Sequence, residues 1–201
     1  MTAIDHVVFD LGGVLVDWDP RYLYRQIFDT DLEVEEFLQN ICTSAWIMQS
    51  DAGRPLDDCI AELVEQHPSQ AAAIMAFRDR WSEMVAGPIV GTVEILRRLK
   101  DQGVPLYVLS TWSRDTWPRA LEMFDFLGWF AGLVVSGLEG VAKPDAEIYH
   151  RLKHHGAVLE RAVFIDDRAD NIAAAEALDM TGIHYQGTDE LRARLKTLNL
   201  L

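Results

Sequence analysis

The segment from Val7 to Pro20 constrains the fold of this chain more than any other. It begins with an apolar run that ends abruptly in Asp10, and Gly12 and Gly13 follow closely. The run predicts a buried strand, and the glycines predict a turn whose backbone can approach a ligand. Ligands of open parallel α/β sheets bind beyond the carboxyl ends of strands. Asp10 is therefore a candidate for chemistry, and the alternative is a carboxylate that only caps the turn.

The composition restricts the partners of this protein. The 201 residues are 49% hydrophobic and 25% charged, with a net charge of −14 and a pI of about 4.7. This acidic excess repels nucleic-acid phosphates and anionic lipid headgroups, so we expect neither nucleic acid nor a membrane as a partner. An anionic substrate needs a metal ion or local cations at its site.

The cysteines and the N-terminal residues bear on location. Cys42 and Cys59 form neither a CxxC motif nor a disulfide framework, which favours reduced thiols. The first six residues lack the features of a signal peptide, and no apolar run approaches a membrane span. We expect a cytoplasmic protein, and the sequence leaves its oligomeric state open.

A helical block follows the first strand. From Arg21 to about Gly87 the apolar residues recur at helical spacing, and a loop is predicted at 50–55 from small residues, glycine and proline. We predict a helical cap at 19–86, inserted into a core formed by 1–18 and 87–201.

Strand and helix patterns alternate after this block. Strands are predicted at 104–109, 133–135, 162–165 and 182–185, and helices at 89–100, within 114–124, and at 145–155, 169–178 and 191–198. The alternation predicts an α/β fold with a Rossmann-like parallel sheet flanked by helices.

Polar residues follow three predicted strands, and a lysine lies in a loop before a predicted helix. Because the carboxyl ends of parallel strands meet at one edge of a sheet, we expect these side chains to share one cleft. The set is Asp10, Ser110, Thr111, Lys143, Asp166 and Asp167.

The carboxylates of this cleft indicate a metal site. Asp10, Asp166 and Asp167 cannot remain ionised at close range without a cation, and ligation by oxygen alone suits Mg²⁺. Asp167 precedes a predicted helix, so its alternative role is that of an N-cap. Two adjacent acids at a strand end favour metal binding.

The remaining polar residues suit a phosphate. Ser110 and Thr111 offer hydroxyls and backbone N–H groups before a possible helix, although such residues also cap helices. Lys143 precedes Pro144, which fixes its loop, and is placed to pair with the carboxylates or to neutralise a phosphoryl group; the alternative is an exposed lysine.

Together these motifs resemble the haloacid dehalogenase superfamily. They are a strand ending in Asp10 with two glycines after it, a strand ending in Ser110-Thr111, the pair Lys143-Pro144, and a strand ending in Asp166-Asp167. Their order and spacing match all four motifs of the superfamily. The resemblance spans roughly residues 4–185, and the helical insertion resembles the cap of the first subclass.

The resemblance implies a phosphatase in which Asp10 attacks phosphorus and forms an aspartyl-phosphate. It implies that Mg²⁺ is held by the Gly12 carbonyl, Asp10 and Asp167, with Asp166 helping through water. Similarity to a sugar-phosphate phosphatase branch implies small phosphorylated metabolites as substrates.

The resemblance also assigns the phosphoryl group to Ser110 or Thr111, with Lys143 opposite. Positioning and charge stabilisation then supply most of the catalysis.

Gly12 departs from this pattern. Most phosphatases of the superfamily carry an aspartate at this position as general acid and base, a role typically worth ~10²–10⁴-fold in rate. Asp17, Asp19 and Asp51 of the cap are the candidate substitutes. If none of them replaces the missing acid, we expect an enzyme that is slow or that acts on esters with good leaving groups.

Two other functions stay open. The 2-haloacid dehalogenases of the superfamily also lack the second aspartate and act on carbon without a metal, but they lack the adjacent acids Asp166-Asp167. A non-catalytic binding or regulatory protein is the other alternative, and Gly12 is the residue that favours it. Trp46 and Trp112 are candidates for lining the substrate site, with core packing as the alternative for both.

Overall fold

The computed structural model describes residues 4–201, and its core is a five-stranded parallel sheet. The strands are β1 (His6–Phe9), β4 (Leu106–Ser110), β5 (Gly132–Val135), β6 (Ala162–Asp166) and β7 (Thr181–His184). Their order is β5-β4-β1-β6-β7, so β1 lies at the centre. This sheet confirms the predicted Rossmann-like fold. Residues 1–3, which belong to the predicted core segment and to the N-terminus assessed for a signal peptide, lie outside the described residues.

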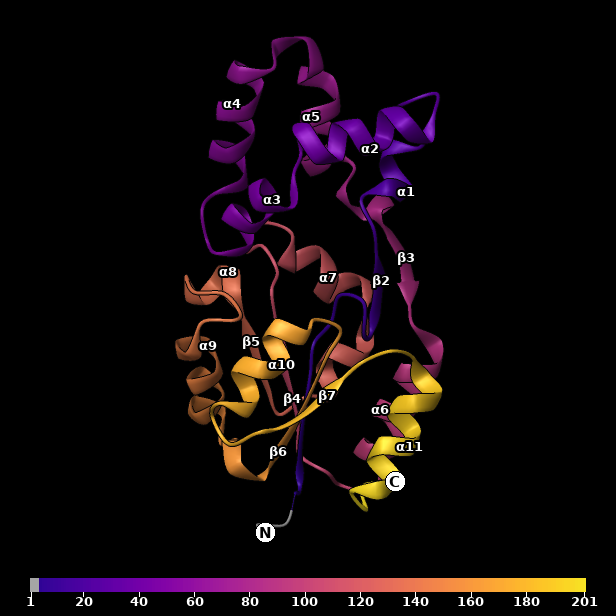
Figure 1. Cartoon of the computed structure of the whole chain (residues 1–201), viewed down its shortest axis with the longest axis vertical. Helices are drawn as coiled ribbons and strands as arrows, with labels where there is room; N and C mark the ends of the chain where they lie inside the picture. The colour runs from indigo at the N-terminus through magenta and orange to yellow at the C-terminus, as the bar shows by residue number, and fades with distance from the viewer. Residues whose placement is uncertain (1–3) are drawn as a thin grey trace.

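Helices cover both faces of this sheet (Figure 1). They are α6 (Val90–Asp101), α7 (Trp117–Met123), α8 (Ser136–Glu139), α9 (Ala146–Arg151), α10 (Ala169–Glu176) and α11 (Thr188–Thr197), with 3-10 turns at Asp125–Trp129, Leu152–His155 and Leu159–Arg161. Val7 and Phe9 of β1 pack in one apolar cluster with α6 and α11, whereas Val8 packs in a second with α9 and α10. Burial on both faces explains why β1 is apolar at successive positions.

A cap of short helices lies above the carboxyl edge of the sheet (Figure 1). It contains α1 (Arg21–Tyr24), α2 (Asp31–Asn40), α3 (Ser44–Asp51), α4 (Leu56–Gln66) and α5 (Ala71–Asp79), with 3-10 turns at Pro68–Gln70 and Trp81–Met84. Thr30 and Glu33 form a capping box that begins α2. Cys59, Ile60 and Leu63 lie on the buried face of α4 and belong to the same apolar cluster as Val7 and Phe9 of β1. The cap is therefore packed continuously onto the core.

Two strands that the sequence did not predict connect the cap to the core. β2 (Val16–Trp18) and β3 (Val85–Pro88) pair antiparallel, although 85–87 was expected to continue the helical block. The pairing joins segments far apart in sequence, and neither strand is long enough to show a clear alternating pattern. The strand pair lies at the predicted junctions of cap and core, and the division into 19–86 and the two core segments remains a proposal.

Two helix predictions of the cap need correction. Ser50 and Asp51 were expected in a loop, but they form the last turn of α3, which Thr43 caps at its N-terminus. Within the predicted helical block, the helix that begins at Ala71 is interrupted at Arg80, and the chain continues as a 3-10 turn to Met84. In the core, the helix expected at 145–155 likewise ends as a 3-10 turn from Leu152. Short helices with few periodic residues are difficult to delimit from spacing alone.

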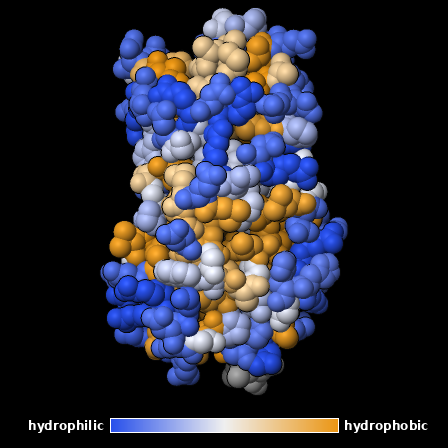
Figure 2. Space-filling view, turned by 180° about the vertical axis from the view of Figure 1, so that it is seen from behind, coloured by the Kyte–Doolittle hydropathy of each residue, from blue (hydrophilic) through white to orange (hydrophobic). Residues whose placement is uncertain are grey.

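The surface combines charged regions with apolar ones. Seen from behind, apolar side chains gather in a band across the middle of the molecule, below the cap (Figure 2). Large exposed apolar residues come from several elements, including Leu32 of α2, Val90 of α6 and Leu138 of α8. Within residues 4–201, no helix has both the length and the apolar character needed to cross a bilayer.

Candidate active site

The turn after β1 places Asp10 at the carboxyl edge of the sheet. The Asp10 N–H donates to the Ile165 carbonyl of β6 at 2.9 Å, and the Leu11 N–H donates to the Asp10 carboxylate at 2.7 Å. Gly13 has a φ of +72°, and a Cβ there would lie 2.6 Å from Asp167 Oδ2. Glycine is therefore needed at position 13 for both its backbone conformation and its close packing.

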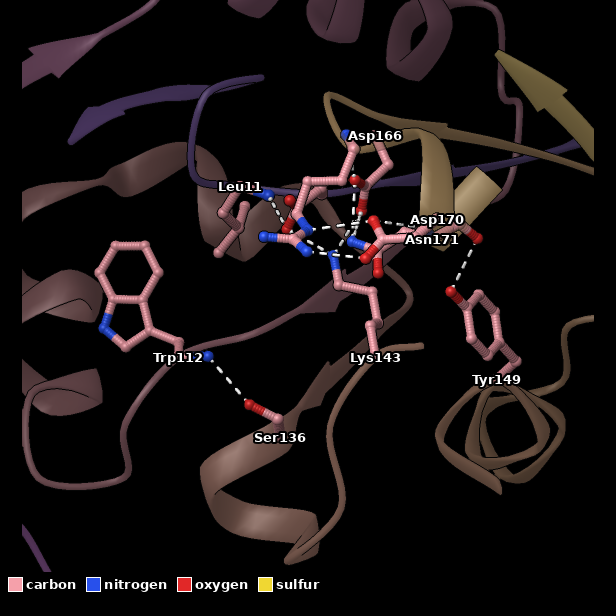
Figure 3. Close-up of polar contacts among 10 residues, drawn as sticks. Leu11, Trp112, Ser136, Lys143, Tyr149, Asp166, Asp170 and Asn171 are labelled. Carbon is pink, nitrogen blue, oxygen red and sulfur yellow. Dashed lines mark hydrogen bonds and ion pairs between the residues drawn. The ribbon is translucent and has the colours of Figure 1, made fainter. Parts of the chain in front are cut away.

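Lys143 links two of the predicted carboxylates. Its ammonium lies 2.9 Å from Asp10 Oδ1 and 2.6 Å from Asp166 Oδ2 (Figure 3). The Lys143 side chain is 1% exposed and those of Asp10 and Asp166 are 10% and 0% exposed. The alternative of an exposed surface lysine is therefore wrong.

Asp166 is held by more than the lysine. The Asn171 amide donates to both of its oxygens at 3.0 and 3.1 Å, and the Arg168 N–H donates at 2.8 Å (Figure 3). Asn171 was not among the residues predicted for the site. Its position five residues after Asp166, in the first turns of α10, is the only sequence signal that marks it.

Burial and charge act against each other on these groups. Burial raises the pKa of Asp10 to about 7 even though the Lys143 ammonium opposes the shift. Burial alone would lower the pKa of Lys143, but the neighbouring carboxylates Asp10 and Asp166 raise it. Burial and the Asp166 charge raise the pKa of Asp167. The site therefore concentrates negative charge and requires cations.

The three carboxylates converge closely enough to hold one metal ion. Asp10, Asp166 and Asp167 each offer an oxygen, and these atoms lie within 4.8 Å of one another. A donor set of oxygens alone fits Mg²⁺. Asp167 is not the N-cap of α10, because Arg168 occupies that position and makes no side-chain cap bond. The backbone of Gly12 lines the same cavity as Asp10 and Asp167.

Ser110 and Thr111 lie in different environments. Ser110 is the last residue of β4, is fully buried, and has a hydroxyl without a hydrogen-bond partner among the described residues. Thr111 lines the cavity that also contains Asp10 and Lys143. The expected helix start does not follow them directly, because α7 begins only at Trp117. Of the two residues, Thr111 is the one that lines this cavity.

Two adjoining cavities lie between the core and the cap. The polar cavity has about 820 Å³ of empty space, open in part to solvent, and is lined by Asp10, Gly12, Gly13, Trp18, Met48, Thr111, Lys143, Asp167, Arg168 and Asn171. The second has about 480 Å³ and is lined by Gly12, Trp18, Ile47, Ser50, Asp51, Phe77, Trp81, Thr111, Trp112, Ser113 and Thr116. We call the second one the apolar cavity. The two meet at Gly12, Trp18 and Thr111.

The two candidate tryptophans have different roles. Trp112 lines the apolar cavity and packs against Trp81 and Trp117 at centroid distances of 5.4 and 6.0 Å. Trp46 instead donates its indole N–H to the Cys59 carbonyl at 3.1 Å and packs against Phe77. The packing alternative therefore holds for Trp46.

The comparisons with known proteins agree with this fold. The family model of haloacid dehalogenase-like hydrolases matches residues 4–179. The chain belongs to this family, as its four motifs predicted, and it is a hydrolase.

Individual relatives cover almost the whole chain. A sesquiterpene phosphatase of Aspergillus oryzae is 30% identical over 100% of this chain and 98% of its own length. A haloacid dehalogenase family enzyme from Bacteroides thetaiotaomicron, in complex with magnesium and inorganic phosphate, has a TM-score of 0.67 at 19% identity, covering 90% of this chain and 93% of its own. The L-2-haloacid dehalogenase of Xanthobacter autotrophicus has a TM-score of 0.64 at 12% identity over 98% and 84% of the two chains. Together the family and the phosphatase relative support phosphoric monoester hydrolysis as the reaction.

Proposed function

We propose that this protein is a Mg²⁺-dependent phosphatase of small phosphorylated metabolites that forms an aspartyl-phosphate on Asp10. The observation that carries the proposal is the buried cluster in which Lys143 contacts both Asp10 and Asp166, with Asp167 beside it. A reaction at this edge needs a nucleophile, a cation for the phosphoryl oxygens and a metal site, and the cluster offers all three.

The residues of the cluster have different roles in the reaction. The Asp10 carboxylate attacks phosphorus, the new O–P bond forms, and the ester oxygen leaves with the bonding electrons and takes up a proton. Water then attacks the phosphorus, releases phosphate and regenerates Asp10. Lys143 neutralises charge on the phosphoryl oxygens and favours the ionised form of Asp10.

The other polar residues position this machinery. Asp166 holds the Lys143 ammonium and is itself held by Asn171. Thr111 is the hydroxyl we assign to the phosphoryl group, in preference to the buried Ser110. Asp10, Asp167 and the Gly12 carbonyl are the ligands we assign to Mg²⁺, with Asp166 as an outer partner. When bound, Mg²⁺ supplies Lewis-acid stabilisation of the transferring phosphoryl charge.

The apolar cavity favours a substrate with an apolar organic group. Trp18, Ile47, Phe77, Trp81 and Trp112 are the apolar side chains that line it, and a volume of about 480 Å³ falls in the range of small-molecule sites, ~300–1,000 Å³. A sugar phosphate, the class that the sequence resemblance implies, has hydroxyls that need polar partners. The sesquiterpene phosphatase relative supports the apolar class.

The alternatives explain the site less well. A metal-free dehalogenase has no use for the adjacent acids Asp166 and Asp167, and the likeness to a solved dehalogenase concerns the fold. A binding protein without activity has no need for a lysine buried against Asp10. We also propose a cytoplasmic location, which the free and buried Cys42 and Cys59 support.

The test is hydrolysis of p-nitrophenyl phosphate with Mg²⁺ and with EDTA, by the wild type and by Asp10→Asn. Turnover that needs both Mg²⁺ and Asp10 supports the proposal, whereas EDTA-resistant turnover contradicts the metal and activity of Asp10→Asn contradicts the nucleophile. Farnesyl monophosphate and glucose 6-phosphate are then compared as substrates. A higher kcat/KM for the sugar phosphate would contradict the apolar class.

A further inference from the structure

Asp51 lies where the cap contacts the core. It is the last residue of α3, and its carbonyl accepts a hydrogen bond from the Ser136 hydroxyl at 2.5 Å. The preceding residue, Ser50, donates its hydroxyl to that of Ser113 at 2.6 Å. The backbone N–H of Ser113 faces the Asp51 carboxyl itself. These contacts fix Asp51 against the loop that follows Thr111.

Asp51 lies on the side of the site where the leaving group is placed. Among the described residues that line the apolar cavity, Asp51 alone has an ionisable side chain. When the phosphoryl group lies over Asp10 and the organic group lies in the apolar cavity, the bridging oxygen must lie where the two cavities meet. Gly12 and Thr111 mark that junction.

Gly12 leaves open space at this junction. A Cβ built on Gly12 would meet no atom within 4 Å. An aspartate at this position would therefore project into empty space, and its absence leaves the bridging oxygen accessible from the cap. A group on α3 can approach this oxygen without displacing a side chain of the core.

The other two acids that follow β1 are engaged elsewhere. Asp17 accepts a hydrogen bond from the Tyr22 hydroxyl at 2.9 Å. Asp19 accepts from the backbone N–H of Arg21 at 2.9 Å and pairs with its guanidinium at 3.2 Å. Neither is among the residues that line the two cavities. Of the three candidate substitutes, only Asp51 faces the site.

We propose that Asp51 is the general acid and base that replaces the residue missing at Gly12, an inference that rests on the proposed phosphatase function. As the ester O–P bond breaks, the protonated Asp51 carboxyl donates its proton to the leaving oxygen. The resulting carboxylate then takes a proton from the water that attacks the aspartyl-phosphate. The cycle returns both Asp51 and Asp10 to their starting forms.

The environment of Asp51 suits both steps. Burial raises the pKa of Asp51 to about 7, and the Ser113 N–H opposes the shift. A catalytic acid is most effective when its pKa lies near the working pH. The shift comes from burial in the apolar cavity, and it leaves both protonation states accessible near neutral pH.

The experiment compares two leaving groups in the first turnover. p-Nitrophenol leaves without a proton, whereas the alcohol of hexyl phosphate needs one. We expect Asp51→Asn to slow hexanol release by about 10²- to 10⁴-fold and p-nitrophenol release by no more than a few-fold. Asp17→Asn is the matched control, because it removes a nearby carboxylate outside the cavities, and it should change neither rate appreciably.

The outcomes separate this proposal from the function it rests on. Unchanged hexanol release in Asp51→Asn overturns it, and so does an equal loss with both substrates, which indicates a structural role. A wild type that cleaves p-nitrophenyl phosphate but not hexyl phosphate also overturns it. If neither ester is cleaved, the proposed function fails and this proposal fails with it.

A pH profile gives a second readout that a structural role would not change. The rate of hexanol release by the wild type should fall as the pH rises above about 7, as Asp51 loses its proton. The Asp51→Asn variant should not show this fall in rate above pH 7, and the Asp51→Glu variant should show it in part. An identical profile in the wild type and Asp51→Asn overturns the proposal.

Discussion

The carboxyl edge of the sheet and the apolar cavity under the cap are neighbours, yet they surround their buried carboxyl groups differently. At the edge, Asp166 is surrounded by the Lys143 ammonium, the Asn171 amide and a backbone N–H. In the apolar cavity, the Asp51 carboxyl faces one backbone N–H and has a pKa raised by burial.

Burial raises the pKa of Asp10 at the edge and of Asp51 under the cap alike, to about 7, but only at the edge does a buried ammonium, that of Lys143, oppose the shift. A buried cation and several hydrogen-bond donors favour the ionised form of a carboxyl group, whereas apolar surroundings alone favour the protonated form. Nucleophilic attack and metal binding need the ionised form, and proton donation needs the protonated form. The boundary between the two environments passes through Gly12, Trp18 and Thr111.

The largest effect should come from the nucleophile at the edge. Asp10→Asn keeps the size of the side chain but removes the attacking carboxylate, so we expect phosphatase activity to fall by roughly 10⁴- to 10⁶-fold, as for nucleophiles of other enzymes. Steady-state assays with p-nitrophenyl phosphate measure the loss. Circular dichroism should show an unchanged fold, and near-normal turnover would exclude Asp10 as the nucleophile.

Lys143→Met should be the most destabilising of these substitutions. It leaves the buried carboxylates Asp10 and Asp166 without their cation, and removing one partner of a buried ion pair costs about 3–5 kcal/mol. Urea unfolding at pH 8 without metal measures the free energy. Arg54→Met breaks the exposed pair with Glu62 and is the control, with a much smaller expected cost. Similar small losses of stability in both variants would contradict a larger contribution from the buried ion pair than from the exposed one.

Asp51→Asn should change how stability depends on pH. The folded protein keeps the Asp51 proton up to about pH 7, whereas an unfolded chain releases it near pH 4. The protonated carboxyl therefore adds stability that is complete below pH 4, declines as the pH rises and is lost above about 7.

The asparagine variant has no such group to titrate. Its free energy of unfolding, relative to that of the wild type, should therefore rise by up to about 1.4 kcal/mol per pH unit between pH 5 and 7. Above pH 7 the difference between the two proteins should become constant. Urea unfolding of both proteins at pH 5, 6, 7 and 8 measures the difference. A difference that does not depend on pH would contradict the apolar environment of Asp51.

The smallest effect should come from the wall of the apolar cavity. Ile47→Ala removes apolar contact area from α3 and should lower kcat/KM for farnesyl monophosphate by about fivefold, which corresponds to about 1 kcal/mol. Activity towards p-nitrophenyl phosphate should change less. Leu32→Ala, at an exposed cap position, is the control. Equal losses on both substrates would indicate that the organic group does not occupy this cavity.

The sequence by itself determined the chemistry of the edge. Each carboxylate or lysine predicted there follows an apolar run or precedes a proline, and a parallel sheet brings such positions together whatever the details of packing. Asp10, Lys143 and Asp166 therefore meet as expected. The fold and the family followed from the same local patterns.

Only the tertiary structure decided the chemistry of the cap side. It placed Asp51 rather than Asp17 or Asp19 on a cavity, and it placed Thr111 on the cavity that Asp10 and Lys143 also line. The physical reason is that these outcomes depend on how α3 packs against the loop after β4, a contact between segments far apart in sequence. No local pattern of apolar and polar residues predicts a contact between two such segments. The periodicity of a helix indicates which of its faces is buried, but not which other segment packs against that face.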